Sequence, residues 1–345
     1  MDRLLLTELT THLENKQPLS ADQMRAALAA MMQAETPDEE IAAFLLALRS
    51  KGETPVEVAA AAEVVRIHMT PIRTNFSNHI DTCGTGGDGL STFNISTAAA
   101  LVVAAAGIPV AKHGNRSVTS KSGSADVLAS LGVQIDAPLE AVENCLEEVG
   151  ICFCFAPVMH PSLKRVAVIR RQLGVPTLFN WLGPLCNPAL APFQLMGVGQ
   201  PRLRRMMAEV HQLLGTRHAV VVHGADGLDE VSIETETFVS IARGDEIVET
   251  VWRAASFGIA ESPISSLTVD GPEESAEVIR AIFAGRPGPH RDIVVANAAA
   301  AIWTARPHDT LRGCAELAQE LIDSGRVHQL VAELAEASQT PPRPV

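Results

Sequence analysis

The stretch "HIDTCGTGGDGLSTFNISTAAALVVAAAG", residues 79–107, joins three kinds of local sequence in one order. Its apolar start predicts a short strand, the four glycines within residues 84–89 predict a loop, and the alanine-rich run from Ile95 predicts a helix. Such a loop brings free backbone amides and a helix N-terminus to the end of a strand, which suits an anion. It is not a P-loop, since no Gly-Lys-Ser or Gly-Lys-Thr follows, and no acidic residue stands about twenty positions further on, as a dinucleotide-binding loop requires.

Four polar side chains surround the predicted start of that helix: Thr92, Asn94, Ser96 and Thr97. A glycine-rich turn alone is structural about as often as functional, and one helix cap needs only one such residue. Their number favours phosphate binding over ordinary capping.

Outward from this stretch, short apolar segments alternate with helical ones. The segments "HIDTC", "IPVAK", "ICFCFA", "FQLMGVG" and "HAVVVHG" predict strands, and the alternation predicts a mostly parallel sheet with crossover helices. A hairpin around Gly244-Asp245 in "TFVSIARGDEIVETVWRA" breaks the pattern. Ligands of such sheets bind at the carboxyl ends of the strands.

The N-terminal part reads differently, because residues 1 to about 70 predict four helices, with Ser20 and Thr36 as N-caps of two of them. We therefore predict an α/β fold with a small N-terminal helical domain, residues 1–74. A larger α/β domain with a mostly parallel central sheet follows at residues 75–338, and residues 339–345 are predicted to be a disordered tail.

Composition narrows the function. The 345 residues carry a net charge of −13, which argues against nucleic-acid and anionic-membrane partners, because both require a positive field. No segment is long and apolar enough to span a membrane. The six cysteines form no CxxC pair, so they predict core positions in a protein of the reducing cytoplasm.

A second loop is rich in cations and hydroxyls. In "VAKHGNRSVTSKSGSADVLASLG", residues 110–132, Lys112, Arg116 and Lys121 lie among five serines and threonines, and no Asp or Glu occurs from Gly89 to Ala125. Phosphate oxygens accept many hydrogen bonds from such groups, whereas a solvated basic turn usually carries a balancing acid. Two phosphate-binding loops predict a ligand with phosphates at two ends.

Two further segments complete the candidate site. Asp229 and Glu230 in "HGADGLDEVSI" follow a predicted strand; they are either ordinary surface acids or, opposite two phosphate loops, ligands of Mg²⁺. Arg170 and Arg171 lie on a helix predicted from about His160 to Leu173. Either both are solvated, or one faces inward beside apolar "LFNWLGPL" and pairs with the carboxylate of a small aromatic acid.

Together the blocks "GTGGDG…TFNIST", "KHGNRSVTSKSGSADVL", "FAPVMHPSLKRVAVIRRQLG", "FNWLGPLCNPA" and "GLDEVS" resemble the anthranilate phosphoribosyltransferase family along essentially the whole chain. The resemblance implies a phosphoribosyltransferase fold of the nucleoside-phosphorylase type, with part of residues 160–180 joining the helical domain. It also implies a homodimer, a requirement for Mg²⁺ with two ions per subunit, and a place in tryptophan biosynthesis. The reaction joins the amine of anthranilate to C1 of phosphoribosyl pyrophosphate and releases pyrophosphate. The resemblance leaves open whether an anthranilate synthase subunit associates.

The resemblance also implies roles for single residues, with no strong general base among them. The implied contacts to phosphoribosyl pyrophosphate are Gly84, Gly87, Asp88, Thr92, Asn94, Ile95, Ser96, Thr97, Lys112, His113, Gly114, Asn115, Arg116, Ser117, Val118, Thr119, Ser120 and Ser124. Those to anthranilate are Gly84, Asn115 and Arg170, with His113, His160 and Pro184 lining its route or pocket. The implied metal ligands are Ser96, Asp229 and Glu230.

Two positions depart from the family pattern: Trp181 replaces an aliphatic residue, and Cys186 replaces the commoner threonine. Trp181 either fills the core or narrows the anthranilate channel. One rival is a pyrimidine nucleoside phosphorylase, which has little use for "GLDEVS" as a metal site. The other, a non-enzymatic nucleic-acid-binding relative, would be basic overall and would lack the acidic pair.

Overall fold

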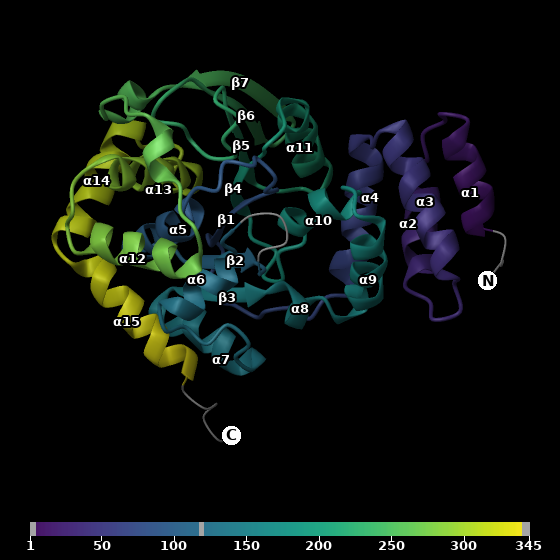
Figure 1. Cartoon of the computed structure of the whole chain (residues 1–345), viewed down its shortest axis with the longest axis horizontal. Coiled ribbons are helices and arrows are strands. Elements are labelled where there is room, and N and C mark those ends of the chain that lie inside the picture. Colours follow the sequence, from purple (N-terminus) through teal and green to yellow (C-terminus); the bar gives the residue numbers. More distant parts are fainter. Residues whose placement is uncertain (1–4, 117–120, 340–345) are drawn as a thin grey trace.

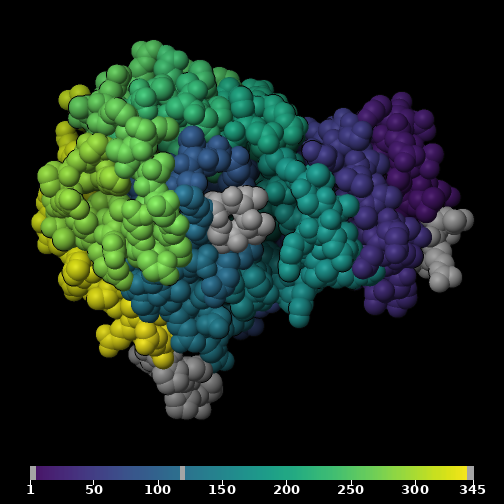
Figure 2. All heavy atoms as spheres, in the orientation of Figure 1, coloured from purple at the N-terminus to yellow at the C-terminus, as the bar shows by residue number. Residues whose placement is uncertain are grey.

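The computed structural model describes residues 5–116 and 121–339, and its first four helices form a bundle. These helices are α1 (Leu5–Glu14), α2 (Ala21–Met31), α3 (Asp38–Lys51) and α4 (Pro55–Ile67). Helix α1 packs on α3, and α2 packs on α4. In Figure 1 the bundle stands to one side of the larger α/β body, and in Figure 2 it forms the purple lobe. The predicted helical domain is confirmed.

One predicted cap is right and the other is wrong. The Ser20 hydroxyl accepts a hydrogen bond from the Gln23 amide, and the Gln23 side chain accepts one from the Ser20 amide, so α2 starts with a capping box. Thr36 does not cap α3, because Pro37, in an extended conformation, is the N-cap residue. The Thr36 hydroxyl instead donates to the Ala30 carbonyl at 2.6 Å, near the end of α2.

The larger body is built on one seven-stranded sheet with the order β3-β2-β1-β4-β5-β6-β7. The strands are β1 (Ile80–Gly84), β2 (Val110–Gly114), β3 (Ile151–Phe155), β4 (Phe193–Gly197), β5 (His218–Gly224), β6 (Thr237–Arg243) and β7 (Glu246–Trp252). Strands β1 to β5 pair in parallel, whereas β6 and β7 pair antiparallel with their neighbours. The mostly parallel sheet and the hairpin at Gly244-Asp245 are both confirmed.

Helices cover both faces of the sheet, because alternate strand residues point to opposite sides. In β4, for example, Leu195 belongs to one hydrophobic core and Met196 to the other. The first core lies under α5 (Ile95–Ala105) and α13 (Pro289–Ala305). The helices around them are α6 (Ser124–Ser130), α7 (Leu139–Asn144), α12 (Pro272–Phe283), α14 (Leu311–Asp323) and α15 (Arg326–Gln339). Helix α11 (Pro201–Leu213) covers the second face and touches α4, so this core continues into the bundle.

Between β3 and β4 the chain leaves the sheet through α8 (Ala156–Met159), α9 (Lys164–Leu173) and α10 (Phe179–Leu185). Helix α9 packs on α3, and its Val166 and Ile169 belong to the core of the bundle. Arg165 fastens this contact by an ion pair with Asp38, whose Oδ1 accepts from Arg165 Nε at 2.7 Å. Figure 1 shows α9 beside the bundle, which is the position expected for residues 160–180.

The boundaries at residues 74 and 338 remain predictions. Gln339, predicted to begin the tail, is the last residue of α15, and the rest of the tail lies outside the described residues. No helix within residues 5–116 and 121–339 is both long and apolar enough to cross a membrane. All six cysteines are free and five are buried, whereas Cys83 in β1 is only half-buried.

Candidate active site

The candidate site lies where β1, β4 and β5 end. Gly84, the last residue of β1, pairs with Gly197 of β4, and Asp229 lies over both. A Cβ atom on Gly84 would stand 2.8 Å from Asp229 Oδ2, and one on Gly197 would stand 1.6 Å from the Asp229 backbone oxygen. Glycine at these two positions therefore lets the loop after β5 reach the glycine-rich loop after β1.

Asp229 is bound directly to the glycine-rich loop. The Gly86 amide donates to Asp229 Oδ2 at 3.0 Å. Burial and the neighbouring Asp88 carboxylate raise the pKa of Asp229 to about 7, far above the usual value of an aspartate. Two acids that oppose each other's ionisation in this way form a ready position for a cation.

The carboxyl group of Glu230 lies against the start of α5. The Ser96 amide donates to Glu230 Oε1 at 3.1 Å, while Lys112 Nζ donates to Ser96 Oγ at 3.3 Å and to the Thr82 carbonyl at 2.6 Å. Burial and the adjacent Asp229 raise the pKa of Glu230 well above its ordinary value, and burial lowers that of Lys112. The acid pair, the basic loop and the glycine-rich loop thus meet around Ser96.

This geometry corrects one expectation. The amides at the start of α5 were expected to be free for an anion, but the structure gives each of the first three an acceptor within the protein. The Ile95 amide donates to Phe93, the Ser96 amide to Glu230 and the Thr97 amide to Asn94. The Glu230 carboxyl group therefore occupies the place at the helix N-terminus that was predicted for a ligand. The side chains of Ile95 and Thr97 are buried, and their contacts to phosphoribosyl pyrophosphate remain predictions.

The donor set around Asp229 fits Mg²⁺. Over the described ranges, no three His, Cys, Asp or Glu side chains gather into a metal-binding group. Mg²⁺ needs only one or two protein carboxylates, because water and ligand phosphates complete its shell. Asp229 and Glu230 could supply these oxygens, and a divalent cation would relieve their repulsion.

The second loop is only partly described. Ser117, Val118, Thr119 and Ser120 lie outside the described residues. Asn115 and Arg116 are exposed, and the Asn115 carbonyl accepts from the Ser124 hydroxyl at 3.3 Å. The Arg116 guanidinium is already paired with Asp126, whose Oδ1 accepts at 2.8 Å. A phosphate at Arg116 would compete with that exposed pair.

Asn94 joins the two loops to the far side of the site. Its Oδ1 accepts from the hydroxyls of Ser122 (2.6 Å) and Ser275 (3.1 Å), the latter on α12. Thr92 forms an isolated antiparallel bridge with Thr268, which ties the glycine-rich loop to the segment before α12. Gly87 and Asp88 lie in the same loop, and the Leu90 amide donates to Asp88 Oδ1 at 3.1 Å.

His113 and His160 form a buried pair beside α10. Their Nε2 atoms are 3.1 Å apart, and His113 Nδ1 donates to the Gly183 carbonyl at 2.9 Å. Burial lowers the pKa of His113 to about 3 and that of His160 to about 4, so both are neutral at pH 7. The pair holds α10, which contains Pro184, against the end of β2.

Arg170 and Arg171 differ in their exposure to solvent, which agrees with the predicted alternative in which one arginine faces inward. Arg171 is exposed, whereas Arg170 is half-buried, with its guanidinium 5.6 Å from the centre of the Phe179 ring. Arg170 Nη2 donates to Asn180 Oδ1 at 3.2 Å, and no carboxylate in the described part of the chain lies within 4 Å of it. Burial lowers the pKa of Arg170, so an incoming carboxylate would stabilise its charge.

Gln194 and Asp81, which the sequence analysis did not single out, connect the elements that carry this site. Gln194 Nε2 donates to the Pro184 carbonyl at 2.6 Å and to Asp81 Oδ2 at 3.2 Å, which connects α10 with β1. Asp81 Oδ1 also accepts from the His113 amide. Each is a polar residue inside an apolar strand segment, and this is the signal that could have found them. Trp181 is buried in the second core, the core-filling alternative.

Comparison with known proteins agrees with this architecture. The chain matches the helical bundle domain of a glycosyl transferase family over residues 7–69 and the a/b domain of a glycosyl transferase family over residues 77–328. An anthranilate phosphoribosyltransferase of Acetivibrio thermocellus is 46% identical over 332 residues, covering 96% of each chain. The chain belongs to the anthranilate phosphoribosyltransferase family.

Solved structures of anthranilate phosphoribosyltransferases superpose on nearly the whole chain. That of Thermus thermophilus is 37% identical with a TM-score of 0.90, covering 96% of this chain and 99% of its own. The enzyme of Saccharomyces cerevisiae in complex with PRPP and Mg is 27% identical with a TM-score of 0.88, covering 96% and 97%. The fold expected from the resemblance to the anthranilate phosphoribosyltransferase family is confirmed, whereas the single-residue roles remain predictions.

Proposed function

We propose that the chain transfers the phosphoribosyl group of phosphoribosyl pyrophosphate to the amine of anthranilate, and that Mg²⁺, for which Asp229 and Glu230 would supply ligands, supports the reaction. One observation carries the proposal. The acid pair contacts the glycine-rich loop at Gly86 and the start of α5 at Ser96, which brings the proposed metal ligands next to the proposed phosphate-binding loop.

Mg²⁺, when bound, supplies neutralisation of the negative charge that grows on the leaving pyrophosphate. Asp229 and Glu230 would hold it together with Ser96, with two ions per subunit as the resemblance implies. Lys112 supports this arrangement from below, because its ammonium is held by Ser96 Oγ and the Thr82 carbonyl. The proposed contacts to the phosphates and the ribose are the eighteen residues that the family resemblance implies for phosphoribosyl pyrophosphate.

Positioning supplies the remaining acceleration. As the bond from C1 to pyrophosphate breaks, the sugar becomes oxocarbenium-like and the aromatic amine attacks from the opposite face. We assign no strong general base, since the pKa of His113 and that of His160 are both lowered far below neutrality. Their role would be to hold α10 and Pro184 at the wall of the anthranilate pocket.

Anthranilate binding would use Arg170, the half-buried arginine of α9 that has no carboxylate partner among the described residues. Arg170 would pair with the substrate carboxylate, and Asn115 would orient the amine. The guanidinium is held by Phe179 and Asn180 but lacks a carboxylate partner in the described chain, which supports this role. We further propose a homodimer and a cytoplasmic location for this enzyme of tryptophan biosynthesis.

The decisive assay follows the fluorescence of anthranilate as it is consumed in the presence of phosphoribosyl pyrophosphate and Mg²⁺. We expect turnover that stops when EDTA removes the metal and returns when Mg²⁺ is added. No turnover by folded protein would contradict the proposal. A second arm offers a pyrimidine nucleoside with inorganic phosphate, and phosphorolysis there would establish the rival instead.

A further inference from the structure

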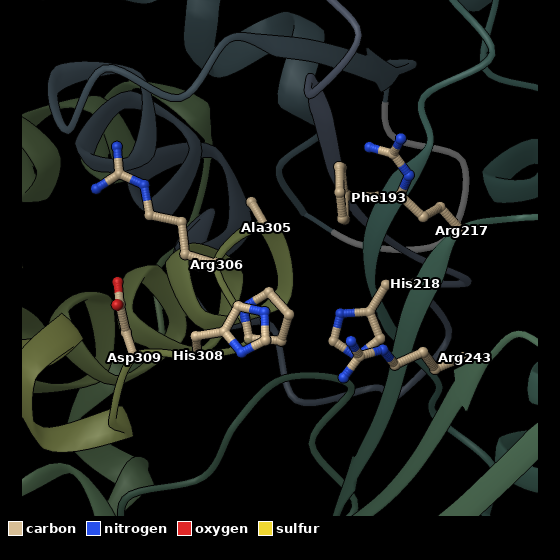
Figure 3. Close-up of a pocket in the computed structure, with 9 residues that line it drawn as sticks. Phe193, Arg217, His218, Arg243, Ala305, Arg306, His308 and Asp309 are labelled. Atoms are coloured by element: carbon tan, nitrogen blue, oxygen red, sulfur yellow. The ribbon is translucent and has the colours of Figure 1, made fainter.

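A cavity of about 460 Å³ opens at the amino ends of the parallel strands, opposite the candidate active site at their carboxyl ends. Phe193 and His218, the first residues of β4 and β5, line it together with Arg243, the last residue of the antiparallel strand β6. Figure 3 shows these side chains on one side and His308 and Asp309, from the turn after α13, on the other. The cavity and the active site therefore lie at opposite ends of the same strands.

The lining of this cavity is strongly basic in an acidic protein. Three arginines line it against the single carboxylate of Asp309, while the chain as a whole carries a net charge of −13. Arg217 and Arg243 are exposed, and neither has a carboxylate within 4 Å among residues 5–116 and 121–339. Arginines that lack a partner in such a setting attract an oxyanion.

Arg217, Arg306 and His218 are held in place by their neighbours. The Arg217 guanidinium lies 5.5 Å from the centre of the Phe193 ring, and Arg306 Nη2 donates to the Ala106 carbonyl at 3.0 Å. His218 is buried, donates from Nδ1 to the Thr304 carbonyl at 2.7 Å and stands opposite Arg243 in the sheet register. Preorganised donors lose less freedom when they bind a ligand.

We propose that this cavity binds a small phosphorylated molecule, with the guanidinium groups of Arg217 and Arg243 as its phosphate contacts. A guanidinium matches phosphate oxygens with two parallel hydrogen bonds. Arg306 adds positive field from the other wall. A single phosphate ion fills little of 460 Å³, and Phe193, Ala305 and Pro307 provide apolar contact for the rest of the ligand.

The tryptophans give a local readout. Trp303 lies edge-on against His218 at 5.5 Å between ring centres, and Trp252 lies 5.6 Å from Trp303. The third tryptophan, Trp181, belongs to the other core. In a Trp181→Phe background the intrinsic fluorescence reports only from beside the cavity. We would titrate this protein, in EDTA, with inorganic phosphate and with phenyl phosphate.

We expect both probes to change the fluorescence, with phenyl phosphate binding more tightly because it also fills apolar space. The double variant Arg217→Gln, Arg243→Gln should weaken binding at least about tenfold, and Asp309→Asn should tighten it. The matched control, Arg49→Gln with Arg286→Gln, removes two exposed arginines elsewhere and should change nothing. Equal affinity of the two probes would identify the ligand as free phosphate.

Two results would overturn the proposal. The first is a fluorescence signal that does not respond to millimolar phosphate or phenyl phosphate. The second is binding with the same affinity in the Arg217→Gln, Arg243→Gln protein, which would place the anion elsewhere. Circular dichroism of each variant separates loss of binding from loss of folding, and Asp309→Asn tests the same charge balance with the opposite sign.

Discussion

The acid pair at the carboxyl ends of the strands, the carboxyl edge, and the arginines at their amino ends, the amino edge, are held differently. At the carboxyl edge, Asp229 and Glu230 are packed against backbone amides, and burial raises the pKa of both. At the amino edge, Arg217 and Arg243 are exposed and stand near one acid of the cavity wall. The carboxyl edge therefore holds charge that is costly without a counter-ion, whereas water already satisfies the charge at the amino edge.

This difference indicates that the carboxyl edge, and not the amino edge, depends on its charge for chemistry. A desolvated acid pair changes its protonation when a cation arrives, so metal binding and proton release are linked. Exposed arginines stay charged at every accessible pH and offer only attraction. Larger effects are therefore expected from substitutions at the carboxyl edge.

The largest effect is expected from Asp229→Asn with Glu230→Gln. These changes keep the size of both side chains but remove the charge that would hold Mg²⁺. We expect kcat/KM to fall at least about 1000-fold, because several kcal/mol of charge stabilisation is lost. The measurement is anthranilate fluorescence with saturating phosphoribosyl pyrophosphate over a range of Mg²⁺ concentrations.

The matched control for this pair is Asp245→Asn with Glu246→Gln, which removes two exposed acids at the hairpin between β6 and β7. It should leave kcat/KM within about twofold of the parent, since surface charges far from the site have small effects. If the Asp229 and Glu230 variant kept a tenth of the parent activity or more, the metal site would have to lie elsewhere.

The second prediction tests whether the acid pair requires the close approach of the Asp229 backbone to β4. Gly197→Ala places a methyl group 1.6 Å from the Asp229 backbone oxygen, so either β4 or the loop after β5 must move. We expect the free energy of unfolding to fall by about 3 kcal/mol, as for an overpacked core, and activity to fall with it. Urea unfolding followed by circular dichroism measures this.

Gly183→Ala, in α10, is the comparison for that variant, because a Cβ there has no heavy atom within 4 Å. It should cost little folding stability. A stable and active Gly197→Ala protein would show that the loop carrying Asp229 can shift without harm.

How much of this contrast the sequence could predict depends on how close the residues stand along the chain. The glycine-rich loop is contiguous, and its neighbours alternate as strand and helix, so the sheet and the carboxyl edge could be predicted. That Glu230 binds the amide of Ser96 could not, because 134 positions separate them and both Mg²⁺ and the helix were plausible partners. The start of α3 was also predicted imprecisely, because the N-cap residue is Pro37 and not Thr36, so the helix begins one residue later than expected.

The amino-edge cavity was not foreseen for a similar reason. Arg217, Arg243 and Arg306 come from three separate elements, and each alone looks like an ordinary surface arginine in the sequence. Only the register of β5 with β6 and the position of the turn after α13 bring them together. Contiguous motifs can be predicted from a sequence, whereas sites assembled from single residues need the fold.

The third effect asks whether one arginine at the carboxyl edge acts through its position. Arg170→Ala should raise the KM for anthranilate about 10- to 100-fold, because a half-buried charged hydrogen bond to the carboxylate is lost. The KM for phosphoribosyl pyrophosphate should change little. Initial rates with each substrate varied in turn give both constants.

Its exposed neighbour Arg171→Ala is a control of equal charge on the same helix, and it should change neither constant. Equal increases in both KM values for the Arg170 variant would mean that Arg170 positions the whole site instead of one substrate.

The smallest effect concerns stability against pH without metal. The pKa of Asp229 is about 7 in the folded protein and near 4 when unfolded. Between these values the unfolded chain has lost the proton and the folded chain keeps it, so rising pH favours unfolding up to about pH 7 and has no further effect above it. The lowered pKa values of His113 and His160 act in the opposite direction below pH 6.5, so the profile of the parent alone is ambiguous.

The difference between the parent and the Asp229→Asn, Glu230→Gln protein removes the histidine contribution. In EDTA, we expect the Tm of the parent to fall relative to that variant as pH rises from 4 to 7, by a few degrees for each 1 kcal/mol lost. At pH 8, Mg²⁺ should raise the Tm of the parent and leave the variant unchanged. The Arg217→Gln, Arg243→Gln protein should follow the parent throughout, because these substitutions leave Asp229 and Glu230 unchanged. A variant that tracked the parent from pH 4 to 7 would show that the carboxyl edge carries no stored repulsion, and the contrast between the two edges would fail.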